Sequence, residues 1–264
     1  MLTQQDGWIS IAEVNPPDLP DLTHRQLDGQ WKHVLITDNV FGKIRVSPYA
    51  YAARITHDVP RVHPTVVVST RDRNILAIES EVRGALGNGV DSFLVVIGDT
   101  MPAVEHHADH LDIVEHLRKL QAVTPPFEVG MPTRFSREMF RRRVDLGSQF
   151  FIVGPVIDPS RVAENVERLG LRAGDPPVFL GVMPPFSSEW IQRAEGFGAV
   201  PSTEELKARV EKAPAAERRA LAWELARETA TEAREAGCSG VVVMGLRFST
   251  VVDEGNREWN GSTA

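Results

Sequence analysis

The chain has 264 residues, of which 42% are hydrophobic and 25% are charged, a composition that favours a globular protein. Its formal net charge of −7 argues against a nucleic-acid partner, because such proteins carry a clustered basic excess. No linker rich in Gly, Ser or Pro divides the sequence, so we expect one domain over residues 1–264.

Cys238 is the only cysteine, which leaves the chain without a disulfide framework or a thiolate metal cage of its own. No apolar stretch approaches the roughly 18 residues of a membrane span. The first residues, MLTQQDG, lack the features of a signal peptide. These observations predict a cytoplasmic protein with no membrane partner and no bound metal.

Short apolar runs recur along the chain, rich in β-branched or aromatic residues and mostly continuous rather than alternating. That pattern is typical of strands buried on both faces of a parallel sheet. The expected strands are Trp8–Val14, His33–Thr37, Thr65–Ser69, Ser92–Ile97, Phe127–Met131, Phe150–Val153, Val178–Met183 and Gly240–Met244.

Segments with helical character separate these runs. Arg73–Leu86 has apolar residues at helical spacing, while Ser136–Leu146 and Ser160–Leu169 each begin with a plausible capping serine and precede a glycine. Residues 203–236 predict a longer helical region interrupted near Pro214.

Eight strands alternating with helices in about 250 residues predict a (β/α)8 TIM barrel within the α/β class. The main competitor is a doubly wound open sheet, which usually has a Gly-rich turn after its first strand. Here that turn is Asn15-Pro16-Pro17. We therefore expect the barrel, with its site formed by loops at the C-terminal ends of the strands.

Two carboxylates end strands of this expected barrel. Glu13 ends the first strand and Asp99 follows the fourth, so both belong at one mouth. A carboxyl group partly screened from water there can hold a proton near neutral pH and act as a general acid. The alternative is that each caps a nearby helix or pairs with Arg45 or Arg71.

The string Arg71-Asp72-Arg73 follows the third expected strand. We expect Asp72 to cap the helix that comes next, one arginine to turn toward the mouth, and Arg73 to lie on the surface.

Several strings resemble the methylenetetrahydrofolate reductases, and most closely the reductase half of bacterial fusions with homocysteine methyltransferase. The most specific is VSTRDRNILAIESEVRGALGNGVDSFLVVIGD, residues 68–99. ITDNVFGKIRVSP, FEVGMP, RRRVDLGSQFFIVGPVID, VFLGVMP and GCSGVVVMG follow the order of that family, so the resemblance covers nearly the whole chain.

The resemblance implies a (β/α)8 barrel that passes a hydride from NAD(P)H through FAD to methylenetetrahydrofolate, giving the methyl form. Glu13 matches the family's general acid in a Glu-x-x-Pro-Pro pattern, and Asp99 matches its Gly-Asp beside flavin and pterin. It places the cofactor at Thr37, His63, Ser69, Thr70, Gly98, Met131 and Arg143, and the substrate at Asp99, Gly154 and Phe186.

Three features depart from the family pattern, whereas Arg143 and Phe186 keep a residue type that the family has there. Gly154 replaces a glutamine that reads the pterin edge, and Met131 replaces an aromatic residue. Arg143 offers a basic side chain to a diphosphate, although a solvated helix end competes, and Phe186 offers an aromatic ring in a loosely aligned loop. The loop after the fifth strand is also short, which cuts down the expected FAD cradle.

These departures keep three alternatives open. One is a flavin-free enzyme in which NAD(P)H gives its hydride directly to the methylene group, and another is a related barrel that acts on a different one-carbon pterin carrier. A non-catalytic barrel that binds flavin or folate is the third. A homo-oligomer is the family habit, which the sequence itself does not show.

Overall fold

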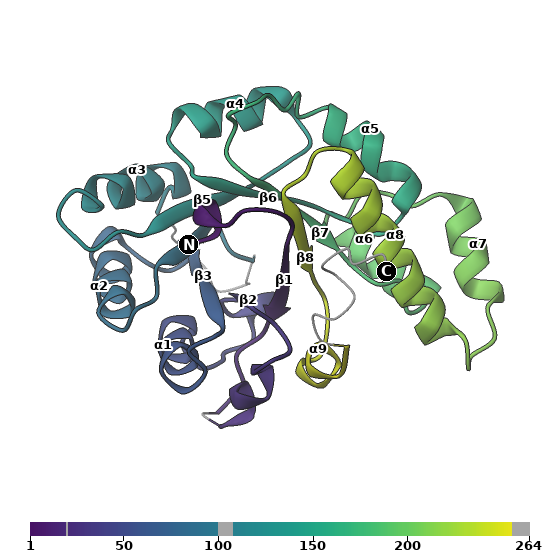
Figure 1. Cartoon of the computed structure of the whole chain (residues 1–264), viewed down its shortest axis with the longest axis horizontal. Helices are drawn as coiled ribbons and strands as arrows, with labels where there is room; N and C mark the ends of the chain where they lie inside the picture. Colours follow the sequence, from purple (N-terminus) through teal and green to yellow (C-terminus); the bar gives the residue numbers. More distant parts are fainter. Residues whose placement is uncertain (20, 100–107, 255–264) are drawn as a thin grey trace.

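Eight parallel strands close into a barrel in sequence order, and β8 pairs back to β1. The computed structural model describes residues 1–19, 21–99 and 108–254. Helices lie outside the ring of strands (Figure 1). The prediction of a (β/α)8 TIM barrel is therefore confirmed.

The strands are four to seven residues long and correspond to the eight expected runs, with ends that differ by up to three residues. They are β1 (Ile9–Val14), β2 (His33–Ile36), β3 (His63–Ser69), β4 (Ser92–Val96), β5 (Glu128–Thr133), β6 (Phe150–Val156), β7 (Val178–Val182) and β8 (Gly240–Val243).

The helices include those expected and others that the sequence pattern left unassigned. The α-helices are α1 (Pro48–Asp58), α2 (Ile75–Leu86), α3 (His110–Leu120), α4 (Arg137–Asp145), α5 (Val162–Glu167), α6 (Ser188–Gly196), α7 (Glu204–Lys212), α8 (Arg218–Glu235) and α9 (Phe248–Glu254). Short 3-10 helices are η1 (Leu2–Gln4), η2 (Thr23–Leu27), η3 (Val40–Gly42) and η4 (Pro159–Arg161).

One helix cap differs from its prediction. The side chain of Asn74 accepts the Ala77 N–H at 2.9 Å and is the N-cap of α2, so the expected cap at Asp72 is wrong. Asp72 instead takes a left-handed backbone conformation, with φ at 53°. The chain turns at this residue before the helix begins, which sends its two neighbouring arginines in different directions.

Two apolar layers follow from the two-residue period of the strands. In β1, Ile9 and Ile11 pack inside the barrel, whereas Ala12 and Val14 pack in the layer between the strands and the helices. The interior is narrow: a Cβ on Gly130 would lie 2.4 Å from the Phe150 ring. The same period places Glu13 on the inner face, near the C-terminal end of β1.

A buried carboxylate closes the opposite end of the barrel. Glu128, the first residue of β5, accepts hydrogen bonds from the backbone N–H groups of Leu2 and Thr3 at 2.6 and 2.9 Å. The hydroxyls of Thr3 and Ser92 donate to the same carboxylate, each at 2.8 Å. Glu128 thereby holds η1 against the base, where Leu2 joins the interior apolar cluster.

We expect Glu128→Gln to destabilise the fold by about 2–4 kcal/mol. The NH2 group of the glutamine would replace one carboxylate oxygen and would then face N–H and O–H groups that need an acceptor. The free energy of unfolding in denaturant measures this loss. Glu115→Gln on the exposed face of α3 is the control and should change stability by less than about 0.5 kcal/mol. Equal effects of the two substitutions would contradict the role given to Glu128.

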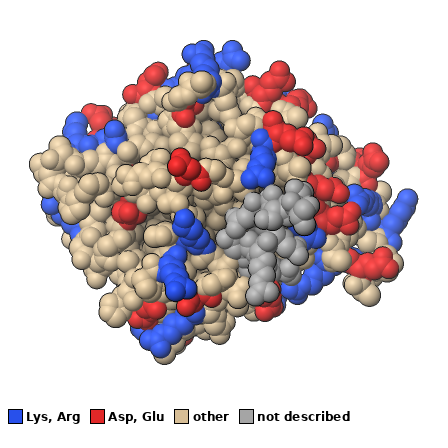
Figure 2. Space-filling model, viewed as in Figure 1, with Lys and Arg blue, Asp and Glu red and all other residues tan. Residues whose placement is uncertain are grey.

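Charged side chains of both signs are interspersed over the face drawn in Figure 2, without one extended basic area. That distribution agrees with the acidic net charge. Within the described ranges, none of the helices combines the length and the apolar character that crossing a bilayer requires.

Candidate active site

Glu13 projects into the barrel at the C-terminal end of β1. Its Oε1 accepts the backbone N–H of Gly245, just beyond β8, at 3.1 Å. Burial raises the pKa of Glu13 above its ordinary value of 4.5; the Gly245 hydrogen bond opposes this rise and the negative charge of Asp99 adds to it. A carboxyl group held this way keeps its proton at higher pH than a free one, as a general acid must.

Asp99 lies at the same mouth, because it follows the C-terminal end of β4. Its Oδ2 accepts the backbone N–H of Phe41 at 2.6 Å. In the described part of the chain, neither carboxylate pairs with Arg45 or Arg71: Arg45 binds Asp18, and Arg71 binds a backbone carbonyl. Both expected carboxylates thus lie at the same mouth and neither pairs with either of these arginines, but Asp99 accepts an N–H of the 3-10 helix η3, which is one of the alternative roles expected for it.

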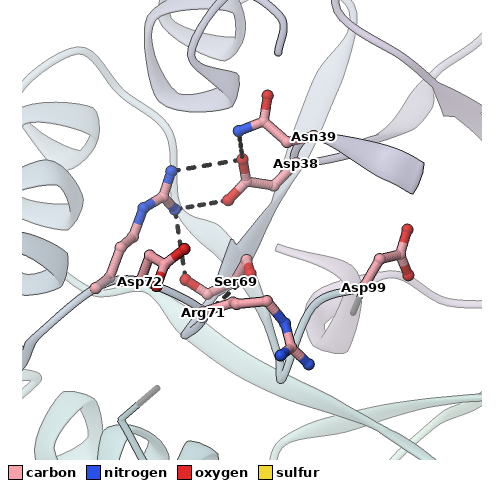
Figure 3. A pocket seen from close by; sticks show the side chains of 7 residues that line it. Asp38, Asn39, Ser69, Arg71, Asp72 and Asp99 are labelled. Atoms are coloured by element: carbon pink, nitrogen blue, oxygen red, sulfur yellow. Dashed lines mark hydrogen bonds and ion pairs between the residues drawn. The ribbon is translucent and has the colours of Figure 1, made fainter. Parts of the chain in front are cut away.

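A polar pocket of about 210 Å³ opens beside Asp99 (Figure 3). Its walls come from the segments that follow β2, β3 and β4, three neighbouring strands of the barrel. The lining residues are Asp38, Asn39, Ser69, Arg71, Asp72, Arg73 and Asp99. Only Ser69 and Asp99 were expected from the sequence to bind a ligand here.

Arg73 and Asp38 form the best-defined ion pair of this pocket. Arg73 Nη1 lies 2.6 Å from Asp38 Oδ2, and its Nη2 lies 3.4 Å from Oδ1, so the pair is two-pronged (Figure 3). The Asp38 side chain is 1% exposed and that of Arg73 is 19% exposed, which corrects the expected surface position of Arg73. Burial raises the pKa of Asp38 although Arg73 opposes the rise.

Two further contacts fix this ion pair. The Asn39 amide donates to Asp38 Oδ1 at 3.0 Å, and the guanidinium of Arg73 lies over the ring of Tyr49, 5.7 Å from its centroid. The sequence does contain a signal for this ion pair, which is the opposite charges of Asp38 and Arg73. Asp38 and Arg73 follow neighbouring parallel strands, whose C-terminal ends meet at one edge.

An exposed aromatic pair stands near Asp99. The rings of Phe41 and Phe197 have centroids 4.6 Å apart, although Phe41 is 58% exposed and Phe197 is 64% exposed. Phe41 also adopts a left-handed backbone, with φ at 56°, which is uncommon outside glycine. The hydrogen bond from its N–H to Asp99 helps to hold that conformation.

Four of the expected cofactor residues lie at the mouth. The Thr37 hydroxyl donates to Asn15 Oδ1 at 2.6 Å, and Ser69 lines the pocket. Thr70 is fully buried, and its hydroxyl makes no hydrogen bond to any residue that the structure describes. Gly98 has φ at 88°, and a Cβ there would lie 2.1 Å from the Ser69 hydroxyl, so glycine is required at this close approach.

His63 and Met131 lie elsewhere. β3 begins at His63 rather than at Thr65, so His63 stands at the base of the barrel, where it stacks on His33 with ring centroids 5.5 Å apart. Met131 is fully buried in the layer between strands and helices, because it alternates with the inward-facing Gly130. Neither side chain joins the pocket that was expected to hold a cofactor.

Arg143, Phe186 and Gly154 occupy the far side of the barrel. Arg143 is half-buried and donates to the Pro132 carbonyl near the end of β5. The alternative that Arg143 is a solvated residue at a helix end is therefore wrong. Phe186 packs edge-on against Trp223 of α8, with ring centroids 5.8 Å apart. Gly154 lies exposed in β6 with φ at 94° and offers the mouth no side chain.

Comparison with protein-family models found no match, and comparison with curated protein sequences found none either. Among solved structures 458 chains match. One is 2,3-dimethylmalate lyase, a PEP mutase/isocitrate lyase superfamily member, at 15% identity and a TM-score of 0.55, covering 92% of this chain and 78% of that one.

Two other matches have similar scores. The carboxyl transferase domain from Rhizobium etli pyruvate carboxylase is 11% identical with a TM-score of 0.51, covering 92% of this chain and 40% of that one. A cube-shaped, highly porous protein cage designed by fusing symmetric oligomeric domains is 10% identical with a TM-score of 0.52, covering 94% and 69%. At such low identities the likeness shows the barrel fold alone.

Proposed function

We propose that this chain is an oxidoreductase that reduces a methylene-tetrahydropterin, such as 5,10-methylenetetrahydrofolate, to the methyl form with NAD(P)H. The observation that carries the proposal is Glu13, an inward-facing carboxyl group at the barrel mouth whose pKa is raised by burial. The resemblance of residues 68–99 and of Glu13-Val14-Asn15-Pro16-Pro17 to methylenetetrahydrofolate reductases supplies the substrate class.

The proposed chemistry needs one proton and one hydride. Glu13 gives its proton to the ring amine that leaves the methylene carbon, and the bridging ring opens to an iminium. The hydride of NAD(P)H then adds to that carbon and completes the methyl group. Asp99 raises the proton affinity of Glu13 before the reaction, and its negative charge also favours the cationic iminium.

Three of the seven residues that the resemblance assigns to the cofactor lie away from the other four and do not fit an FAD cradle at the mouth. Met131 packs against the helices, His63 stands at the base, and Arg143 is bound to a backbone carbonyl. These placements favour the flavin-free route, in which the hydride passes directly from NAD(P)H to the substrate. We therefore assign no step to FAD.

The test is an anaerobic assay of the purified protein with methylenetetrahydrofolate and either NADH or NADPH. Oxidation of the nucleotide together with formation of the methyl product, identified by mass, is the expected result. Absorption spectra with and without added FAD decide the route: activity without flavin bands, unchanged by FAD, supports direct transfer. Failure to reduce the substrate with both nucleotides, also after FAD is added, would sink the proposal.

The raised pKa of Glu13 predicts the pH dependence of the reaction. The acid must be protonated, so we expect kcat/KM to fall as pH rises through a pKa that lies above 4.5. A pH–rate profile of the wild type measures this decline. A rate independent of pH from acid to neutral would argue against Glu13 as the proton donor.

A further inference from the structure

The segment that follows β2 crosses the barrel mouth. The backbone N–H of Phe41 in this segment donates to Asp99, beyond β4, at 2.6 Å. The ring of the same residue meets the ring of Phe197 at the end of α6, with centroids 4.6 Å apart. That end of α6 lies beside the C-terminal end of β6, because the N–H of Val200 donates to the Pro155 carbonyl at 2.9 Å. Phe41 thus bridges segments that belong to separate parts of the ring, β4 and β6.

Both ends of this segment are fixed to the barrel. At its start, the Asn39 amide donates to Asp38, whose carboxylate is itself held by its buried ion pair. At its end, the backbone N–H of Arg45 donates to the Asn39 side chain at 2.9 Å, and the Arg45 guanidinium donates to the Pro16 carbonyl at 2.9 Å. We call residues 40–44, which lie between these anchors, the strap.

The strap is exposed, and two contacts hold it at Phe41. Ile44 is 86% exposed and Phe41 is 58% exposed. The backbone turns through left-handed conformations at Asn39, Phe41 and Gly42, with φ at 48°, 56° and 68°. A few residues at the end of a fixed element are where a chain absorbs the φ/ψ changes of a hinge motion. The strap can therefore swing about its anchors once the contacts of Phe41 are released.

The helix that the strap meets, α6, also borders the Glu13 side of the mouth. The N–H of Gly245 donates to Glu13, and a Cβ on Gly245 would lie 2.7 Å from the ring of Trp190 in α6. The aromatic contact of the strap therefore joins it to the helix beside Glu13, while its hydrogen bond joins it to Asp99. These two contacts hold the strap over the mouth that contains both carboxylates.

We propose that the strap is a gate over the barrel mouth, closed by the contact between Phe41 and Phe197 and opened to admit ligands to Glu13. The role of the gate in turnover rests on the proposed function: a closed gate keeps water from the iminium, to which water would otherwise add. An open gate lets substrate enter and product leave. The gate itself is a property of the fold and is measurable with no ligand present.

Hydrogen exchange of the Phe41 amide, resolved by fragmentation mass spectrometry, measures opening without a ligand, because this N–H exchanges when it leaves Asp99. For Phe197→Ala we expect exchange about 3–10-fold faster than in the wild type, since the aromatic pair no longer favours the closed strap. Val123→Ala is the matched control and should leave exchange unchanged, because Val123 is 74% exposed but precedes β5 at the base. Thermal unfolding verifies that both variants keep the fold. Equal exchange in Phe197→Ala and the wild type would overturn the gate.

A cleavable cross-link tests whether the gate controls access. Phe41→Cys and Phe197→Cys are combined and joined by a bismaleimide that carries a disulfide in its spacer; the native Cys238 is buried and should not react. We expect NADH and NADPH, followed by their fluorescence, to bind at least about 10-fold more slowly while the link is intact. Binding should recover when a reductant cleaves the spacer. Binding at the same rate before and after cleavage would overturn the gate.

The outcomes also separate this inference from the proposed function. Faster exchange in Phe197→Ala and nucleotide binding that depends on the cross-link, without turnover of methylenetetrahydrofolate, would reject the reductase and leave the gate supported. Turnover at one rate before and after cleavage of the link would support the reductase and reject the gate. A wild type that binds neither nucleotide would reject the reductase, and the hydrogen exchange alone would then decide on the gate.

Discussion

Glu13→Gln is expected to lower turnover of methylenetetrahydrofolate about 10²–10⁴-fold, the usual loss when a general acid is removed. Glutamine has nearly the same shape and can still accept the Gly245 N–H, so substrate binding should change little. The measurement is kcat and KM for the nucleotide-dependent reduction in parallel with the wild type. The alkaline decline of the wild-type profile should also disappear from the residual rate.

The stability of the same variant distinguishes lost chemistry from lost structure. The pKa of Glu13 is raised in the folded state, so the folded protein binds the proton more tightly than the unfolded chain does. The contribution of Glu13 to stability therefore falls as pH rises above 4.5 and through the raised pKa. Glu13→Gln should remove this dependence and be at least as stable near neutral pH. Unchanged turnover in a folded variant would remove Glu13 from the mechanism.

Arg73→Met is expected to destabilise the fold by about 3–5 kcal/mol near neutral pH, because it leaves the buried Asp38 carboxylate without its ion-pair partner. Without the guanidinium, the pKa of Asp38 should rise further above its ordinary value of 3.8. The loss should therefore shrink as pH falls and Asp38 takes up a proton. Denaturant unfolding at neutral and mildly acidic pH measures both effects.

A double-mutant cycle tests whether this loss belongs to the pair. Asp38→Asn combined with Arg73→Met should cost clearly less than the sum of the single changes, since neither charge is then left alone. Arg83→Met removes an exposed helix pair and should cost about 0.3–0.5 kcal/mol. Additive losses at Asp38 and Arg73 would show that the two side chains act independently.

The fold was predictable because the local sequence of each strand is enough to identify it as a strand. Continuous apolar runs located all eight strands, and Ser136 caps α4 as expected, its hydroxyl accepting the Met139 N–H at 3.4 Å. The position of Glu13 followed from the strand end and from the barrel rule alone. His63 was assigned to the cofactor by resemblance, whereas the first residue of a barrel strand lies at the base and not at the mouth.

The pocket was less predictable because it depends on partners that only folding brings together. Met131 was assigned by resemblance, whereas the alternation of β5 turns it away from the mouth. Arg73 resembled a solvated residue near a helix start, and its burial depends on Asp38, 35 residues earlier. The left-handed turn at Asp72, which separates Arg71 from Arg73, has no composition signal comparable to glycine.

The barrel contains two inward-facing glutamates with opposite surroundings. Glu128 is surrounded by four described donors at the base, whereas Glu13 has one near the rim. Because the two ends share no residue of these contacts, substitutions at one end should add to those at the other within a few tenths of a kcal/mol. Substitutions at the mouth can therefore change the substrate, while stabilising substitutions at the base restore the free energy of unfolding that they remove.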